Sequence, residues 1–284
     1  MNEPDHDSEP VREMPNSQPK VEEEDICWRC GKLIGGQAVC CHCGARAATG
    51  PAVNPRDSRR PADSGTSILR LIWIFSALLL VSLIYGWIIH FGLRSEPHIE
   101  GGFTTAALIR QLTFECIDSV LVVGALLWVG RPSPLPTATP NRRLAAWLLA
   151  PAVLAILLAA NFGYSWMLRN ILLFPDVTEM PHADAALLGW IVLANCIQPA
   201  IVEELFCRYL ALGVLRMVIN VHGAVLISAI MFGMAHIFNP LFIPVFVGTG
   251  IILGYLRVMS GGMLLPMLLH FGHNGFITLL ESWL

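Results

Sequence analysis

Residues 185–208 read AALLGWIVLANCIQPAIVEELFCR, an apolar run that ends in two adjacent glutamates and, four positions after Glu204, an arginine. Apolar runs of this kind are typical of membrane-spanning helices, because about 20 residues cross a hydrocarbon layer ~30 Å thick. Ionisable groups at such depth cost roughly 2.5–3.5 kcal/mol each on insertion scales, so by default they face the protein interior and serve a function. Glu203, Glu204 and Arg208 are therefore the first candidate site residues.

The overall composition is that of a membrane protein with a polar head. Hydrophobic residues make up 55% of the chain and charged residues 14%, against about 25% charged residues in an average soluble protein. Residues 1–25 hold nine acidic and two basic residues, whereas long runs beyond residue 68 carry no charge. No basic face suggests a nucleic-acid partner.

The head is predicted to have three parts. Residues 1–25 form an acidic tail that cannot bury enough apolar surface to fold alone, and residues 47–66 form a flexible linker. Residues 26–46 hold two C-x2-C pairs, formed by Cys27, Cys30, Cys40 and Cys43. Four thiolates at this spacing can close a tetrahedral shell, so we expect a short zinc ribbon with structural zinc and a docking surface for a protein partner.

Disulfides and redox-active thiols are the alternative interpretations of these cysteines, and Cys41 or His42 could replace one of the four zinc ligands. No positively charged start with an apolar core and a small-residue cleavage site is evident, so we expect no secretory signal peptide. The first hydrophobic segment should then act as the anchor.

The body, residues 67–284, is predicted to be an all-α bundle of about seven membrane-spanning helices. Its hydrophobic segments lie at about 68–92, 103–129, 143–166, 185–215, 222–238, 241–257 and 262–281. The fifth and sixth segments are short and separated by three residues only, so six or eight spans stay open.

The arginines predict the orientation of the bundle. Those expected at one end are Arg56, Arg59, Arg60, Arg70, Arg131, Arg142, Arg143, Arg216 and Arg257, and the opposite loops hold Arg94 and Arg169. By the positive-inside rule we expect a multi-pass protein of the plasma (inner) membrane with a cytoplasmic N-terminus. A reducing cytoplasm favours zinc over disulfides in the head.

Two further polar pairs lie on later segments, Phe232 with His236 and His270 with Asn274. Residues four apart share a helix face, so Glu204 and Arg208 can form an ion pair, Phe232 can flank His236, and His270 and Asn274 can point into one cavity. Counted along the helices, Glu203 and His236 both lie about 20 Å from the inner boundary and His270 about 12–15 Å, so the three can meet. Pro199 cannot donate to the Asn195 carbonyl, which predicts a loosened helix one turn before Glu203.

The order E-E-x-x-x-R, F-x-x-x-H and H-x-x-x-N on successive membrane helices resembles the CAAX protease and bacteriocin-processing family of intramembrane endopeptidases, also called the Abi family. The resemblance covers about residues 143–284 and does not include the zinc ribbon. It implies a helical membrane core with an active site reached from the cytoplasmic side. It also implies a metal-free glutamate mechanism, with Glu203, His236, His270 and Asn274 catalytic and Glu204 and Arg208 supporting.

The residues themselves suggest roles. A carboxylate in a low-dielectric cavity can take a proton from water and return it to a leaving amine, which makes Glu203 the candidate base. His236 would orient that water, and His270 and Asn274 could donate hydrogen bonds to the oxyanion of a tetrahedral intermediate. Two histidines and one glutamate also form a known catalytic zinc shell, so a zinc at Glu203, His236 and His270 stays the alternative.

Other polar residues carry weaker predictions. His273 is expected to pack rather than to act in the site. Arg110, Glu115 and Asp118 in the second segment could line the cavity, but we expect them to pair with one another or to lie near the interface. The sequence thus predicts an intramembrane endopeptidase acting on a membrane protein or peptide. A non-catalytic scaffold or immunity protein and a proton-coupled transporter are the alternatives.

Overall fold

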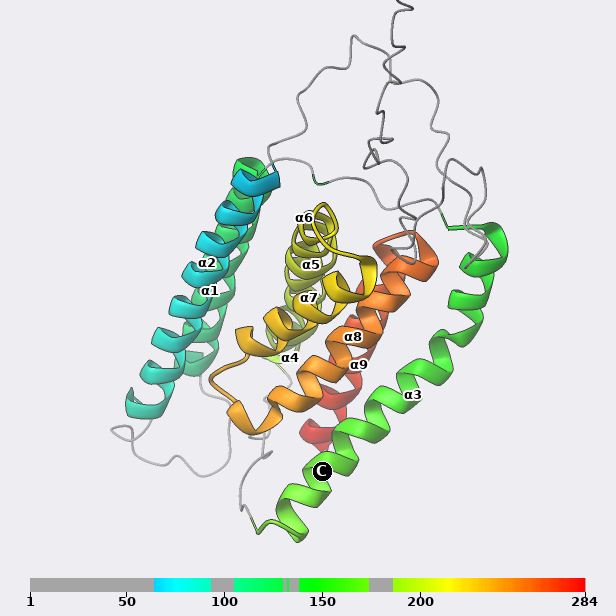
Figure 1. Cartoon of the computed structure of the whole chain (residues 1–284). Coiled ribbons are helices and arrows are strands. Elements are labelled where there is room, and N and C mark those ends of the chain that lie inside the picture. Colours follow the sequence, from blue (N-terminus) through cyan, green and yellow to red (C-terminus); the bar gives the residue numbers. More distant parts are fainter. Residues whose placement is uncertain (1–63, 93–104, 130–131, 133–137, 174–185, 284) are drawn as a thin grey trace, which may run out of the picture. The chain divides into compact units, whose positions relative to one another are not determined.

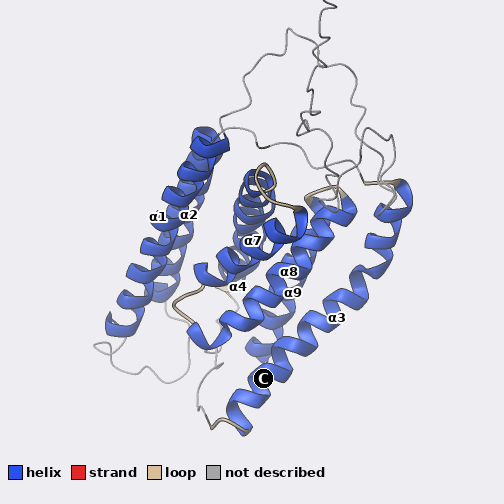
Figure 2. Ribbon diagram, in the orientation of Figure 1, coloured by secondary structure: helices blue, strands red, loops and turns tan. Residues whose placement is uncertain are grey.

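Helices make up nearly all of the part of the chain that the computed structural model describes, which is residues 64–92, 105–129, 132, 138–173 and 186–283 (Figure 2). These residues belong to a unit that spans Asn54–Leu284. No strand occurs among them, which confirms the predicted all-α class. The predicted acidic tail and zinc ribbon, with Cys27, Cys30, Cys40 and Cys43, lie outside the described residues, as does nearly all of the linker, so these stay predictions.

Among the described residues, seven helical segments follow one another (Figure 1). They are α1 (Ser64–Gly92), α2 (Thr105–Val129), α3 (Pro140–Asn170), a broken fourth segment, α7 (Val221–Ala235), α8 (Ile243–Ser260) and α9 (Leu264–Trp283). The fourth segment consists of α4 (Leu188–Val192), η3 (Leu193–Ile197), α5 (Gln198–Glu204), η4 (Leu205–Ala211) and α6 (Leu212–Leu215), and a single 3-10 turn, η5 (Pro240–Phe242), precedes α8. The described segments thus agree with the working count of seven.

Five of these segments are long and apolar enough to cross a membrane, namely Gly65–Ile88, Thr105–Val129, Pro140–Asn170, Leu188–Leu215 and Pro240–Ser260. Val221–Ala235 and Leu264–Leu280 are apolar but shorter. Large apolar side chains on the outer helices are exposed, for example Leu127 at 82% and Leu148 at 71%. Water-soluble proteins rarely expose so much apolar side-chain surface to solvent. Lipid chains can cover this surface, so the bundle is an integral membrane protein.

The fourth segment is broken by two π-helical turns, and the first of them has a visible cause. Pro199 has no N–H to donate to the Asn195 carbonyl four residues earlier, so the regular helical ladder cannot continue there. The chain widens into a π turn over Leu193–Ile197 immediately before α5. This confirms the loosening that Pro199 predicts, and it places Glu203 one turn after the break.

Helices α7 and α8 form a close hairpin because small residues lie where they touch. A Cβ atom added at Gly250 would come within 2.9 Å of the Ala229 backbone, and one at Gly254 within 2.9 Å of Val225. Gly250 and Gly254 are four residues apart on one face of α8, a spacing that lets membrane helices approach closely. The hairpin fixes His236, which follows the last residue of α7.

Helix α2 is attached to the broken fourth segment by polar side chains. The Gln198 side chain donates to the Glu115 carbonyl at 3.0 Å and lies 3.1 Å from the Ser119 hydroxyl. Gln111 donates to the side-chain oxygen of Asn195. These contacts set the rotation of α2, so that its polar residues face the inside of the bundle rather than lipid.

Candidate active site

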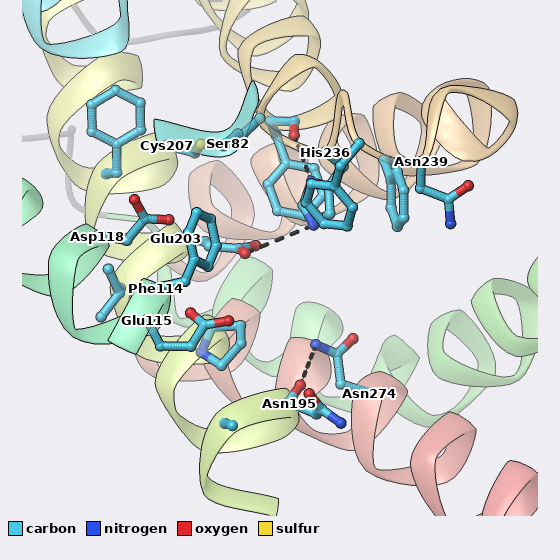
Figure 3. A pocket seen from close by; sticks show the side chains of 18 of the residues that line it. Ser82, Phe114, Glu115, Asp118, Asn195, Glu203, Cys207, His236, Asn239 and Asn274 are labelled. Carbon is cyan, nitrogen blue, oxygen red and sulfur yellow. Dashed lines mark hydrogen bonds and ion pairs between the residues drawn. The ribbon is translucent and has the colours of Figure 1, made fainter. Parts of the chain in front are cut away.

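Glu203, near the end of α5, lies where the three predicted motifs meet. Its Oε1 is 3.8 Å from His236 Nε2 and its Oε2 is 3.8 Å from His270 Nε2. Figure 3 shows the carboxylate turned toward His236 across a cavity. The structure therefore brings together Glu203, His236 and His270 from α5, the end of α7, and α9, as the counting of depths along the helices predicts.

The orientation of His236 follows from its backbone contact. Its Nδ1 lies 2.9 Å from the Phe232 carbonyl oxygen, and because a carbonyl can only accept, Nδ1 must carry the hydrogen. In the neutral ring Nε2 is then an acceptor that faces Glu203. The ring also stacks on Phe246, with centroids 4.1 Å apart. His236 is thus held in one tautomer and one position.

A buried ion pair, formed by Glu204 and Arg208, contacts the active site through His270. Glu204 and Arg208 are both fully buried, and Arg208 Nε lies 3.2 Å from Glu204 Oε2, which confirms the predicted ion pair. The Arg208 guanidinium also lies over the Phe232 ring, 4.7 Å from its centroid. The other oxygen of Glu204, Oε1, faces His270 Nδ1 at 3.3 Å. Arg208, Glu204 and His270 therefore form a chain of contacts that ends at Glu203.

The position of His270 differs from the one expected for a residue that lines the cavity. His270 is 4% exposed, both of its ring nitrogens are turned to carboxylates, and it does not line the cavity. His270 thus faces the two carboxylates rather than the cavity, and its oxyanion role stays a prediction. His270 instead lies between Glu203 and Glu204, where an N–H on each nitrogen would hold both carboxylates.

Asn274 does face the cavity, and the break at Pro199 explains its position. Its Nδ2 donates to the Asn195 carbonyl at 3.0 Å, the same carbonyl to which Pro199 cannot donate (Figure 3). An amide nitrogen carries two hydrogens, so one donor of Asn274 stays available. The hydrogen bond between Asn274 and Asn195 thus joins the third motif to the π turn.

His273 lies in the cavity wall, and the prediction that it packs rather than acts in the site stays a prediction. Its Nδ1 is 3.3 Å from Asn274 Oδ1, and it is one of the lining residues although it is 6% exposed. A donation from His273 would fix the Asn274 amide so that its nitrogen, not its oxygen, faces Asn195. Of the two histidines on α9, His273 lies beside the cavity and His270 beside the carboxylates.

The cavity has a volume of about 500 Å³ and mixes polar and aromatic walls. Glu203, His236 and Asn274 line it together with Phe232, Phe246 and Phe238. A space of this size accommodates several side chains of a peptide. Phe232 is 5.1 Å from the His236 ring and T-shaped to His270 at 5.6 Å between centroids, so it flanks His236 as predicted.

Two carboxylates from α2 form the opposite wall, against the expectation that they lie near the interface or only pair with each other. Glu115 and Asp118 line the cavity (Figure 3), and Asp118 Oδ1 is buried without a hydrogen-bond partner. The sequence contains a signal for this, because Gln111, Glu115 and Asp118 repeat at intervals of four and three and therefore share a helix face. The cavity thus holds three carboxylates in all, from two helices.

Within the described ranges, no three His, Cys, Asp or Glu side chains are grouped so that they could hold a metal ion. A catalytic zinc at Glu203, His236 and His270 stays an untested alternative. The four cysteines predicted to bind structural zinc lie outside those ranges.

Comparison with known protein families gives a match over the broken fourth segment and the three motifs. The family model described as type II CAAX prenyl endopeptidase Rce1-like matches residues 185–276. This region is narrower than the resemblance inferred from the motifs, residues 143–284, but contains all three motifs and every contact described around Glu203. No curated protein and no solved structure matches the chain.

Proposed function

We propose that the chain, whose residues 185–276 match the type II CAAX prenyl endopeptidase Rce1-like family model, is an intramembrane protease of the CAAX protease and bacteriocin-processing (Abi) family that hydrolyses a peptide bond with a water activated by Glu203. The observation that carries the proposal is the 3.8 Å gap between Glu203 Oε1 and His236 Nε2. This gap is too long for a hydrogen bond. One water about 2.8 Å from each atom would bridge them.

The proposed reaction uses two hydrogen-bond acceptors, Glu203 Oε1 and His236 Nε2. The bridging water donates one hydrogen to Glu203 and the other to His236 Nε2, which leaves a lone pair on the water oxygen for attack. As that oxygen bonds to the carbonyl carbon, Glu203 takes the proton. When the C–N bond breaks, Glu203 returns the proton to the leaving amine, so the carboxylate is regenerated.

The oxyanion that forms during attack needs a donor. The second hydrogen of Asn274 Nδ2 is the candidate, since the first is held by the Asn195 carbonyl. A donor fixed before the reaction stabilises developing charge without reorganisation, and removal of one such donor typically costs about 10²–10³-fold in kcat.

The remaining residues act through Glu203 and His236. An N–H on His270 Nε2 would attract Glu203 Oε2, which is buried and has no hydrogen-bond partner, and would leave Oε1 free for water. Phe232 supplies the carbonyl that orients His236 and the ring that covers Arg208. These residues position the reacting groups rather than touch the substrate.

The proposed substrate is a membrane protein or peptide that reaches the cavity from the cytoplasmic side, with the chain in the plasma (inner) membrane and its N-terminus in the cytoplasm. The zinc ribbon would recruit a protein partner. The proposed mechanism needs no catalytic metal.

The test compares protein termini by quantitative mass spectrometry in host cells that express the native chain or Glu203→Gln at equal levels. We expect termini that appear with the native chain and decrease by about 10²–10⁴-fold without the base. Glu281→Gln makes the same chemical change in the last turn of α9 and should preserve every product. Identical termini with the native chain and Glu203→Gln, under several growth conditions, would favour the scaffold or transporter alternatives instead.

A further inference from the structure

Two arginines outside the active site have no counterion among the carboxylates that the structure describes. Arg216 follows the last residue of α6, and Arg257 lies in the last turn of α8. Arg257 is 8% exposed, yet its Nε and Nη1 are buried without a hydrogen-bond partner, and so is Nη1 of Arg216. Neither arginine forms a salt bridge with any described carboxylate.

The two arginines lie at neighbouring helix ends. Helix α7 begins five residues after Arg216, and His222 Nδ1 in its first turn lies 2.9 Å from the Tyr255 hydroxyl, two residues before Arg257. A buried cation without a partner is strongly unfavourable, and a second cation beside it adds to the cost. The contrast with Arg208 is direct, because Arg208 is equally buried but has Glu204 and the face of Phe232.

Both arginines lie at an end of the bundle that is rich in arginine. Gly261, just after α8, lies against Ala138, since a Cβ atom built on it would be 3.1 Å from the Ala138 backbone, so the end of α8 adjoins the start of α3. Arg142 and Arg143 are exposed in the first turn of α3. Figure 1 places the end of α6 and the start of α1 at this same end. Such a belt of arginines is typical of the level of the lipid headgroups.

We propose that Arg216 and Arg257 together bind the phosphate group of an anionic phospholipid. A guanidinium presents its N–H donors in a planar fork that matches two phosphate oxygens, and a phosphate between two guanidiniums neutralises both. Val218 and Leu264, which flank the site in sequence, are 47% and 60% exposed and can contact the acyl chains. This site is independent of the proposed protease function.

The test measures the melting midpoint of the purified full chain in neutral detergent. Dioctanoyl phosphatidylglycerol is added in one series, dioctanoyl phosphatidylcholine in a second and inorganic phosphate in a third. We expect phosphatidylglycerol to raise the midpoint more than phosphatidylcholine does. Arg257→Gln and Arg216→Gln should lose this difference, and Arg142→Gln, which removes an exposed charge from the same end, should keep it.

Removal of a buried unpaired charge gives a second readout. In detergent without lipid, Arg257→Gln should melt at or above the native midpoint, whereas an arginine that only held the fold together would leave a less stable protein when removed. Arg216 is more exposed than Arg257, so if Arg257→Gln does not fold, the melting midpoints with the two lipids are compared in Arg216→Gln instead. Equal midpoints in the two lipids, or loss of the lipid effect in Arg142→Gln as well, would overturn the site. An equal shift with inorganic phosphate would keep the anion site and overturn the lipid as its source.

Discussion

Arg208→Met tests whether the buried Arg208–Glu204 pair holds the active site in place. Removal of one partner of a fully buried ion pair typically costs about 3–5 kcal/mol, because the other charge stays buried without compensation. In Arg208→Met, Glu204 still has one partner, because His270 Nδ1 lies 3.3 Å from it. The expected loss of stability is therefore near the lower end of this range. The contact with the Phe232 face, 4.7 Å from its centroid, adds up to about 2 kcal/mol when desolvated. The free energy of unfolding should therefore fall by about 3–5 kcal/mol.

The measurement is denaturant unfolding of the purified chain in detergent, followed by the fluorescence of its eight tryptophans. The matched control is the double variant with Glu204→Leu and Arg208→Met, since replacement of both charges by apolar groups is often neutral or stabilising. It should unfold within about 2 kcal/mol of the native chain, because only His270 loses a partner. Its proteolytic activity should stay low, since nothing then holds His270 against Glu203. A loss below about 1 kcal/mol for Arg208→Met, or a double variant as unstable as the single, would refute the reasoning.

Three further predictions concern the cavity, the hairpin and the head. Asn274→Ala should lower kcat about 10²–10³-fold if its free hydrogen binds the oxyanion, and should destabilise the chain by about 1–3 kcal/mol because a backbone carbonyl loses its donor; both are measured on purified protein once a substrate is known. Gly250→Val should cost about 1–3 kcal/mol by overpacking the α7–α8 contact and should lower activity by moving the end of α7, whereas Gly248→Ala meets no atom within 4 Å and should change neither. Cys27→Ser should remove about one zinc per chain, measured by elemental mass spectrometry of the full chain, and Cys116→Ser, at an exposed position on α2, should remove none.

Opposite results would contradict each prediction separately. An Asn274→Ala enzyme with native kcat would exclude its oxyanion role. A native melting midpoint for Gly250→Val would mean that α7 and α8 separate without cost. Equal zinc contents in Cys27→Ser and the native chain would reject the ribbon as the zinc site without bearing on catalysis.

The sequence alone predicts the helical bundle and the meeting of Glu203, His236 and His270, because each depends on local rules. Apolar length gives the spans, a rise of 1.5 Å per residue gives the depths, and the missing N–H of Pro199 gives the break. All three rules act within a single helix and need no knowledge of its neighbours.

The sequence does not predict which face of α9 meets the cavity. His270 and His273 are three residues apart and lie on nearly the same side, so a small rotation of the helix exchanges their surroundings. That rotation is set by contacts far away in sequence, such as Asn274 with the Asn195 carbonyl. Glu115 raises the same problem, since its place in the wall depends on the contact of Gln198 with α2.

The short helix α7 has a consequence for the surrounding lipid. Its 15 residues span about 22 Å, less than the ~30 Å of an average hydrocarbon layer. Leu226, Ile227 and Ile230 on its outer side are exposed, so lipid meets this helix directly and must compress beside it. Hydrophobic mismatch of this kind costs fractions of a kcal/mol per ångström. Compressed lipid shortens the path from bulk water to His236 at the end of α7, and a bilayer with longer acyl chains lengthens that path again.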